Sequence, residues 1–290
     1  MQIGLRVLGF TAFLGFCILL PACSDDSNPE SPSGIPVPTL DNVWPNEDGN
    51  FWEYELTNET RSWTDFTLYE NAEDVPPIPP LQTLYEELGN IPEGPVFETI
   101  AGTLHMKFNG EITNDVGVTA QRKTMVIDPG GSGLWAPHLL GTEIWQKQAV
   151  RIVGFSLYTA VPTWIYLESN LSSGHQFQCD IAPGLADATM TGRVWRRCRI
   201  EINGTSLKNC LECFYLVDLG VQMATNESGE LIGYLRDYWY GVVVYAPEIG
   251  PVYCHERCQL FGNPVLQDQP AGILDIKATL VDYGASTVGD

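Results

Sequence analysis

The amino-acid sequence predicts a mainly β protein, an antiparallel sheet interrupted by one short helical excursion. Several segments alternate apolar and polar residues with a period of two, which is typical of half-buried strands. Two Asn-Gly pairs stand between strand-like runs, and such pairs favour the tight turns of β-hairpins. One segment, residues 81–88, instead spaces its apolar residues as one face of a helix.

The first strand-like segment places Trp52, Tyr54 and Leu56 on one face of a strand. Glu53 and Glu55 alternate with them and fall on the other face. Two carboxylates could serve glycoside hydrolysis if they flanked a sugar bond. Neighbouring acids on one strand face are, however, typical of a wet surface, so we assign this pair no catalytic role.

Hairpins are predicted at both Asn-Gly pairs, because a type I′ turn needs a positive φ at its two central residues. Residues 104–108 alternate and lead into Asn109-Gly110, where we expect the first turn. Asn203-Gly204 predicts the second turn. Further strands are expected over residues 199–202, 211–217, 238–245 and 273–283.

A short helix is predicted between two proline-rich runs, residues 75–80 and 91–95. Its apolar face would consist of Leu81, Leu84, Tyr85 and Leu88. Because no repeat period and no second linker follow, and all-β domains of roughly 200 to 250 residues are ordinary, we expect one β-rich domain over residues 46–290.

Composition excludes nucleic acid as a partner. The chain has 290 residues, of which 44% are hydrophobic and 18% charged, so it can bury a core. Fifteen Lys and Arg stand against thirty-six Asp and Glu, which gives a formal net charge of −21. A surface this negative repels phosphate backbones.

The first 22 residues are predicted to be a signal peptide. Arg6 is the only charge before Asp25, and the run Val7 to Leu20 has Thr11 as its only polar residue. At fourteen residues the run is too short to span a bilayer core of about 30 Å.

Leu20-Pro21-Ala22-Cys23 resembles the lipobox of bacterial lipoproteins, although Pro21 departs from the usual pattern. The resemblance implies that Cys23 carries lipid and anchors the chain to a bacterial envelope membrane. Ser24 directly after it implies the outer membrane. Ordinary cleavage and a bare membrane anchor remain alternatives. Residues 23–45 are rich in Pro, Ser, Asn and acids, so we expect a solvated tether.

Short motifs at both ends of the domain resemble a group of bacterial secreted proteins and lipoproteins with β domains. The first motif, Pro-x3-Gly-Asn-x-Trp-x-Tyr, matches Pro45, Gly49, Asn50, Trp52 and Tyr54. The second, Tyr-Ala-x-Gly-Val-Gly-x-Val, is matched by Tyr245, Ala246, Ile249, Gly250 and Val252, with Glu248 where the group usually has Gly. The resemblance implies a curved antiparallel half-barrel or open barrel, similar to lipoprotein carriers, with an apolar groove and no particular catalytic residue.

Six cysteines would remain in the mature chain, namely Cys179, Cys198, Cys210, Cys213, Cys254 and Cys258. In an exported protein an even number favours disulfides. Cys179 and Cys198 fall on consecutive predicted strands, so we expect them to pair, which leaves Cys210 and Cys213 to bond with Cys254 and Cys258. Zinc bound by the last four is the alternative, but residues three apart on a strand point to opposite faces.

Four arginines crowd into seven residues and are candidates for an anion site: Arg193, Arg196, Arg197 and Arg199. The simpler interpretation is a strand face that pairs its Arg with acids across the sheet. The four histidines are scattered, without the spacing of metal ligands. We therefore predict no catalytic residue, no metal and no cofactor.

Three classes of function stay open. The sequence favours a non-enzymatic envelope lipoprotein that binds an apolar or polymeric ligand or a protein partner, since an anchor is predicted and a catalytic set is not. A hydrolase of glycans or esters is the first alternative, and a structural role in surface assembly is the second. An apolar-lined cleft would favour the first class, and convergent carboxylates or a Ser-His pair the second.

Overall fold

The computed structural model describes residues 24–25, 36–62, 67–128, 138–155, 160–181, 188–225, 230–260 and 272–285. The predicted signal peptide and Cys23 lie outside these residues. None of the helices within the described part of the chain is long and apolar enough to cross a membrane.

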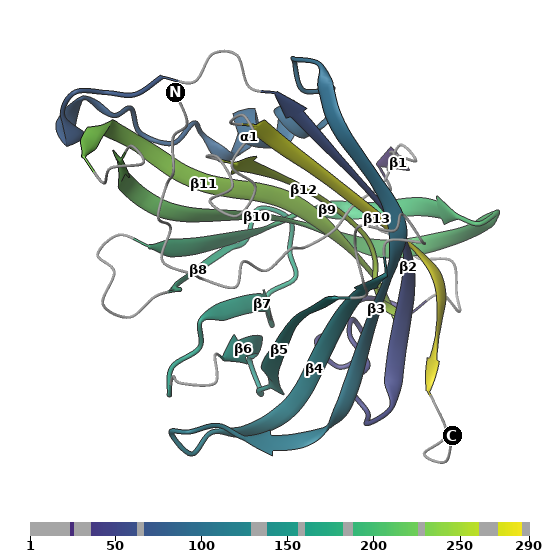
Figure 1. Ribbon diagram of the computed structural model, residues 1–290. Helices are drawn as coiled ribbons and strands as arrows, with labels where there is room; N and C mark the ends of the chain where they lie inside the picture. The colour runs from purple at the N-terminus through teal and green to yellow at the C-terminus, as the bar shows by residue number, and fades with distance from the viewer. Residues whose placement is uncertain are drawn as a thin grey trace.

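Strands joined by antiparallel pairing make one curved sheet that nearly closes on itself (Figure 1). The elements are β1 (Ser24–Asp25), β2 (Asn50–Ser62), η1 (Ala72–Asp74), α1 (Leu81–Leu88), β3 (Val96–Thr113), β4 (Thr119–Asp128), β5 (His138–Lys147), β6 (Arg151–Phe155), β7 (Trp164–Glu168), β8 (Gln176–Asp180), β9 (Thr189–Ile202), β10 (Thr205–Thr225), β11 (Leu231–Ala246), β12 (Gly250–Leu260) and β13 (Gly272–Ala285). Their order in the sheet is β1-β9-β10-β11-β12-β13-β2-β3-β4-β5-β6-β7, and β8 also pairs with β9. Strand β7 contacts β8 and β9, which brings the far end of the sheet back to its beginning. The predicted mainly β class is confirmed.

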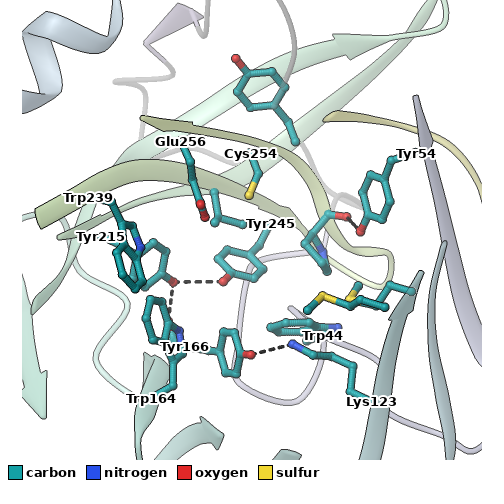
Figure 2. Close-up of a pocket in the computed structure, with 15 residues that line it drawn as sticks. Trp44, Tyr54, Lys123, Trp164, Tyr166, Tyr215, Trp239, Tyr245, Cys254 and Glu256 are labelled. Carbon is teal, nitrogen blue, oxygen red and sulfur yellow. Dashed lines mark hydrogen bonds between the residues drawn. The ribbon is translucent and has the colours of Figure 1, made fainter. Parts of the chain in front are cut away.

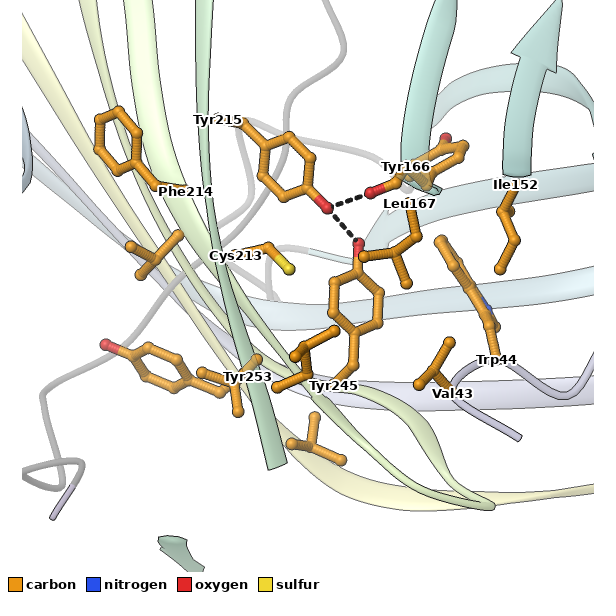
Figure 3. Packing of buried hydrophobic residues seen from close by; sticks show 14 of the residues in the cluster. Val43, Trp44, Ile152, Tyr166, Leu167, Cys213, Phe214, Tyr215, Tyr245 and Tyr253 are labelled. Carbon is orange, nitrogen blue, oxygen red and sulfur yellow. Dashed lines mark hydrogen bonds between the residues drawn. The ribbon is translucent and has the colours of Figure 1, made fainter. Parts of the chain in front are cut away.

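The core fills the space that this curved sheet encloses. Trp52, Phe108, Trp145 and Tyr245 are among the largest fully buried side chains, and they come from four different strands. Because side chains alternate between the two faces of a strand, each strand contributes every second residue to the interior. Figure 3 shows part of this packing around Tyr245.

The predicted helix is confirmed as α1, with Leu84 and Leu88 buried. The helix covers part of the face of the sheet that points away from the interior, where it contacts β11 and β12. Residues 210–217 of β10 are consequently buried on both faces. The side chains of this strand therefore alternate between its two faces as predicted, but their burial does not alternate because both faces are covered.

The hairpin predicted at Asn203-Gly204 is confirmed. Strand β9 ends at Ile202 and β10 begins at Thr205, so the loop has two residues. Their φ angles are 50° and 75°, which is the positive pair that a type I′ turn requires.

The hairpin predicted at Asn109-Gly110 is wrong. Strand β3 continues through both residues, and its register against β4 shifts between Phe108 and Glu111. Gly110 has a φ of 71° and its amide donates to Asp48 Oδ1 at 2.6 Å. A glycine with positive φ is compatible with a β-bulge as well as with a hairpin turn, so the Asn-Gly pair alone does not distinguish the two. The pairing of β3 with β4 decides for the bulge.

Three apolar residues near the end of the predicted tether pack on the sheet instead of lying in solvent. Leu40, Val43 and Trp44 are buried, and the amide of Glu248 donates to the carbonyl of Asn42 at 2.6 Å. The average composition of this stretch is dominated by Pro and acidic residues, so three apolar side chains do not change the prediction of a tether. For this reason the predicted boundary at residue 45 lies after residues that already pack on the domain.

Candidate functional site

A cavity of about 80 Å³ lies inside the curved sheet (Figure 2). Seven strands and the segment before β2 contribute to its wall, so no single stretch of sequence encodes it. Most of the lining side chains are apolar or aromatic. They are Trp44, Tyr54, Met106, Lys123, Met125, Trp164, Tyr166, Tyr215, Trp239, Val243, Tyr245, Pro251, Tyr253, Cys254 and Glu256.

Trp44 is the centre of the aromatic wall. Its ring meets the ring of Tyr166 edge-on at 4.8 Å and that of Trp145 at 5.6 Å, and it lies 5.7 Å from the ring of Tyr245. Edge-to-face contacts of this kind fix ring orientations beyond what burial alone provides. These contacts orient the rings of the wall, although Trp44 belongs to the segment that precedes the first long strand.

The tyrosine hydroxyls around the cavity bond to the protein itself. Tyr215 donates to the carbonyl of Tyr166, so the Tyr245 hydroxyl, 3.0 Å away, donates to Tyr215 in turn. Tyr54 donates to the carbonyl of Pro251 at 2.8 Å. Burial raises the pKa of Tyr54 and of Tyr215 well above the usual 10, so both stay neutral.

One buried cation belongs to the same wall. Lys123 is 2% exposed, and its ammonium donates to the Tyr166 hydroxyl at 2.6 Å. Its Nζ also lies 4.6 Å from the centre of the Tyr166 ring and 5.2 Å from that of Trp44, within cation–π range. The sequence analysis missed this residue. The available signal is a Lys that shares the alternating face of the apolar Met125 on the same strand.

A glycine permits close packing of β11 against β12 beside the cavity. Gly241 stands between Trp239 and Val243 on the inward face of β11. A Cβ there would lie 2.4 Å from the carbonyl oxygen of His255 and 2.5 Å from Cγ of Glu256 on β12. Glycine thus lets the two strands approach closely.

The two motifs of the family resemblance meet at the wall of this cavity. The Trp52 indole donates to the carbonyl of Ile249 at 2.6 Å. Gly250 has a φ of 102°, and a Cβ on it would lie 3.1 Å from Trp52 Nε1 and 3.3 Å from Trp44 Cδ1. Residues almost two hundred positions apart in the sequence therefore connect β2 to the start of β12. This contact gives Trp52, Ile249 and Gly250 a structural role.

The pairing of strands does not bring the predicted disulfide partners together. Cys179 lies opposite Met190, and Cys198 is eight residues farther along β9, roughly 26 Å away. Cys213 and Cys254 face the same side but have Val243 of β11 between them, which separates their Cα atoms by roughly 10 Å. A disulfide needs Cα atoms within about 7 Å. Cys179, Cys213, Cys254 and Cys258 are thiols in the structure.

The thiols that face the interior are poor nucleophiles and poor metal ligands. Burial raises the pKa of Cys213, Cys254 and Cys258, and it raises that of Cys179 to about 11, so the thiol forms are favoured over the thiolates. Within the described part of the chain, no group of three or more His, Cys, Asp or Glu could hold a metal ion.

The arginine cluster spreads over both faces of β9. Arg196 forms an ion pair with Glu212, its cross-strand partner on β10, at 2.6 Å. The Arg193 guanidinium lies 4.7 Å from the centre of the Trp195 ring, and burial lowers the pKa of Arg197. Arg196 therefore follows the simpler interpretation, a strand face paired across the sheet, and adjacent arginines point in opposite directions.

The candidate acids and histidines lie away from the cavity. Glu53 and Glu55 project from the face of β2 opposite Tyr54, and His105 Nδ1 lies 3.6 Å from Glu53 Oε2. His255 is buried against Asp275 on the outward face of β12. The lining residues named above include one carboxylate, Glu256, and neither Ser nor His.

Comparison with known proteins adds one similarity. No known family and no curated protein matches the chain. A solved structure from Bacteroides fragilis, described as an exported protein with a YmcC-like fold, is similar at 10% identity and a TM-score of 0.33, over 84% of this chain and 99% of that one.

Proposed function

We propose that the protein binds an apolar molecule in the cavity inside its sheet. The aromatic cavity is the observation that carries this proposal. Its walls come from residues that the fold holds in place, and the tyrosine hydroxyls of Tyr54 and Tyr215 are already bonded to backbone carbonyls. Such a lining offers a ligand mostly apolar contact, worth roughly 25 cal/mol per Å² removed from water.

The size of the cavity favours a small group over a polymer. A volume of about 80 Å³ accommodates an aromatic ring or the end of a hydrocarbon chain. Glycan binding would call for hydrogen-bonding groups spread along an open groove. Glycoside hydrolysis would in addition call for two carboxylates across the site, whereas Glu256 is the one carboxylate of the lining.

The proposed setting is a bacterial envelope membrane, with the outer membrane favoured over the inner one. It rests on the predicted signal peptide and on Cys23 as the lipid-bearing residue, followed by Ser24. The lipid would hold the β domain near a membrane, where apolar molecules are abundant. The proposed binding of an apolar molecule at the membrane involves no catalysed reaction.

The binding proposal is tested by isothermal titration calorimetry with toluene, whose single ring matches the size of the cavity, titrated into the purified protein. Saturable binding is expected, together with a change in the emission of the tryptophans of the wall. Val243→Phe should weaken binding at least about tenfold, because the larger side chain fills the cavity. Val221→Phe on β10, where the residue is 38% exposed, is the matched control and should bind as the unaltered protein does.

Circular dichroism and thermal melting of both variants establish that they are folded. Equal affinity in a folded Val243→Phe variant would contradict binding in the cavity. Native mass spectrometry of protein isolated from its own membrane provides an independent check, since a retained ligand adds directly to the mass.

A further inference from the structure

We propose that Cys198 and Cys210 form a disulfide across strands β9 and β10. The two residues are Cα partners in the antiparallel ladder, and both are completely buried. Residues directly opposite in such a ladder project to the same face. The fold thus sets side by side two cysteines that the sequence analysis assigned to different partners.

The geometry of the ladder suits a disulfide. Opposed residues of an antiparallel pair have Cα atoms about 4.5 or 5.5 Å apart, depending on the hydrogen-bonding pattern. Disulfides span Cα separations of about 4.4 to 6.8 Å, so either kind of pair fits. Cys213 and Cys254, with Val243 between them, and Cys179, opposite Met190, have no such placement.

The bond would lie where the ladder is irregular. The register of β10 against β9 shifts between Leu207 and Cys210, and Asn209 has a φ of 54°. A bulge weakens the pairing around it. A covalent link directly after the bulge fixes the register of the β9–β10 hairpin, which turns at Asn203-Gly204.

Formation requires an oxidant, which we take to be a disulfide reagent of the thiol-exchange class, such as oxidised glutathione or the oxidised dithiol of an envelope oxidoreductase. One cysteine thiolate attacks the reagent disulfide, forms a mixed disulfide and releases one reagent thiol. The other cysteine then attacks the protein sulfur of the mixed disulfide and releases the second thiol. Two protein thiols and one reagent disulfide thus give one protein disulfide and two reagent thiols. Since both sulfurs are buried in the folded chain, exchange takes place during folding.

In the cell this proposal rests on the proposed export of the protein, but its chemistry is tested without export. The full-length chain is unfolded with reductant, refolded in a buffer of reduced and oxidised glutathione, alkylated and digested with a protease that cleaves after Glu. Cleavage after Glu201 and Glu212, combined with trypsin cleavage after Arg193 and Arg197, places Cys179, Cys198, Cys210 and Cys213 on four separate peptides. Mass spectrometry should find the peptides of Cys198 and Cys210 joined and lighter by two hydrogen atoms.

Stability gives the second readout. Reductant should lower the melting temperature of the refolded protein by roughly 5 to 10 °C. It should have no effect on the double variant Cys198→Ala with Cys210→Ala, in which the pair is absent. The matched control, Cys213→Ala with Cys254→Ala, should keep the full sensitivity to reductant.

Recovery of Cys198 and Cys210 as alkylated thiols, or bonded to other cysteines, overturns the proposed pair. Loss of the reductant effect in the control variant would do the same. If the pair forms in glutathione buffer but is reduced in protein isolated from its cells, the proposed location fails and the pairing stands.

Discussion

Glu248 has a φ of 68°, a left-handed conformation that costs residues with a Cβ roughly 1 to 2 kcal/mol. It stands at the position where the resemblance of the second motif implies Gly. Its amide bonds to Asn42, so the turn that carries it also holds the segment leading to Trp44. One residue thus keeps a strained backbone next to the wall of the cavity.

Glu248→Gly should stabilise the protein by about 0.5 to 1 kcal/mol. Glycine removes the strain of the positive φ, and the greater freedom of the unfolded chain offsets part of the gain. Chemical denaturation measures the effect. Glu248→Ala is the control and should give no such gain because it keeps the Cβ. A Gly variant no more stable than the Ala variant would contradict the assigned strain.

Asp275 is the centre of a buried polar cluster. Its Oδ1 accepts hydrogen bonds from His255 Nε2 at 2.9 Å and from Arg257 Nη2 at 3.1 Å, and its Oδ2 forms an ion pair with Lys277. Burial alone would raise the pKa of Asp275, but these donors and charges outweigh it and hold the pKa well below the usual range. Burial lowers the pKa of His255.

The protein should lose stability as the pH falls below about 6.5, where the unfolded chain takes up a proton on His255 that the folded chain refuses. With the folded pKa of His255 lowered, its contribution is complete above the unfolded pKa and declines by up to about 1.4 kcal/mol per pH unit below it. Denaturation at pH 7.5, 6.5 and 5.5 measures this slope.

His255→Gln should flatten that slope, because Gln retains a hydrogen-bond donor for Asp275 and does not titrate. His105→Gln, at an exposed imidazole, controls for the loss of a histidine as such. An unchanged slope in His255→Gln would remove His255 as the cause.

At the scale of elements, helix α1 is held on the sheet by apolar contacts and by hydrogen bonds. The Tyr85 ring stacks on Trp195 at 4.1 Å, and its hydroxyl donates to Glu212 Oε1 at 2.7 Å. The Arg257 guanidinium donates to the carbonyl of Glu87, in the last turn of the helix, at 2.7 Å. A cation at a helix C-terminus also suits the helix dipole. An eight-residue helix is too short to be stable alone, so these contacts hold it in place.

Leu84→Ala should detach α1 while the sheet persists. Leu84 is completely buried, and truncation of such a side chain costs about 2 to 5 kcal/mol. Hydrogen exchange should become fast over residues 81–88 and stay slow in β11 and β12. Thr83→Ala, at an exposed position of the same helix, is the control. Fast exchange throughout the sheet would show instead that α1 and the sheet unfold as one unit.

At the scale of the whole molecule, the proposed anchor and the β domain are separable. Cys23→Ala should move the protein from the membrane to the soluble fraction, because the acyl chains supply the attachment and a net charge of −21 opposes binding to anionic lipid. Cell fractionation measures the distribution. Cys17→Ala, inside the predicted signal peptide, should leave the protein on the membrane. A Cys23→Ala protein that stayed attached would contradict anchoring through this residue.

The sequence predicted elements wherever one local rule applied. Residues 81–88 form the helix that their apolar spacing predicts, and Asn203-Gly204 forms the predicted turn, because helical periodicity and a positive φ are properties of a few neighbouring residues. Asn109-Gly110 carries the same local signal but forms a bulge, since the strand that pairs beside it is chosen by contacts far along the chain. The class of fold could therefore be predicted, and the assignment of that turn could not.

The cavity and the cysteine pair were decided by the tertiary structure alone. Trp44 was predicted to belong to the tether, and its packing against Tyr166 and Tyr245 instead makes it part of the cavity wall. The sequence did not single out Lys123, which is buried because β4 curves over the interior. Cys198 faces Cys210 because the register of β9 and β10, with its bulge, brings them opposite each other. The amino-acid sequence by itself determined the mainly β class, the helix over residues 81–88 and the turn at Asn203-Gly204. The register and the curvature of the sheet depend on how strands distant in the sequence bury their apolar faces together. Only the tertiary structure therefore decided which side chains contact one another in the cavity and in the cysteine pair.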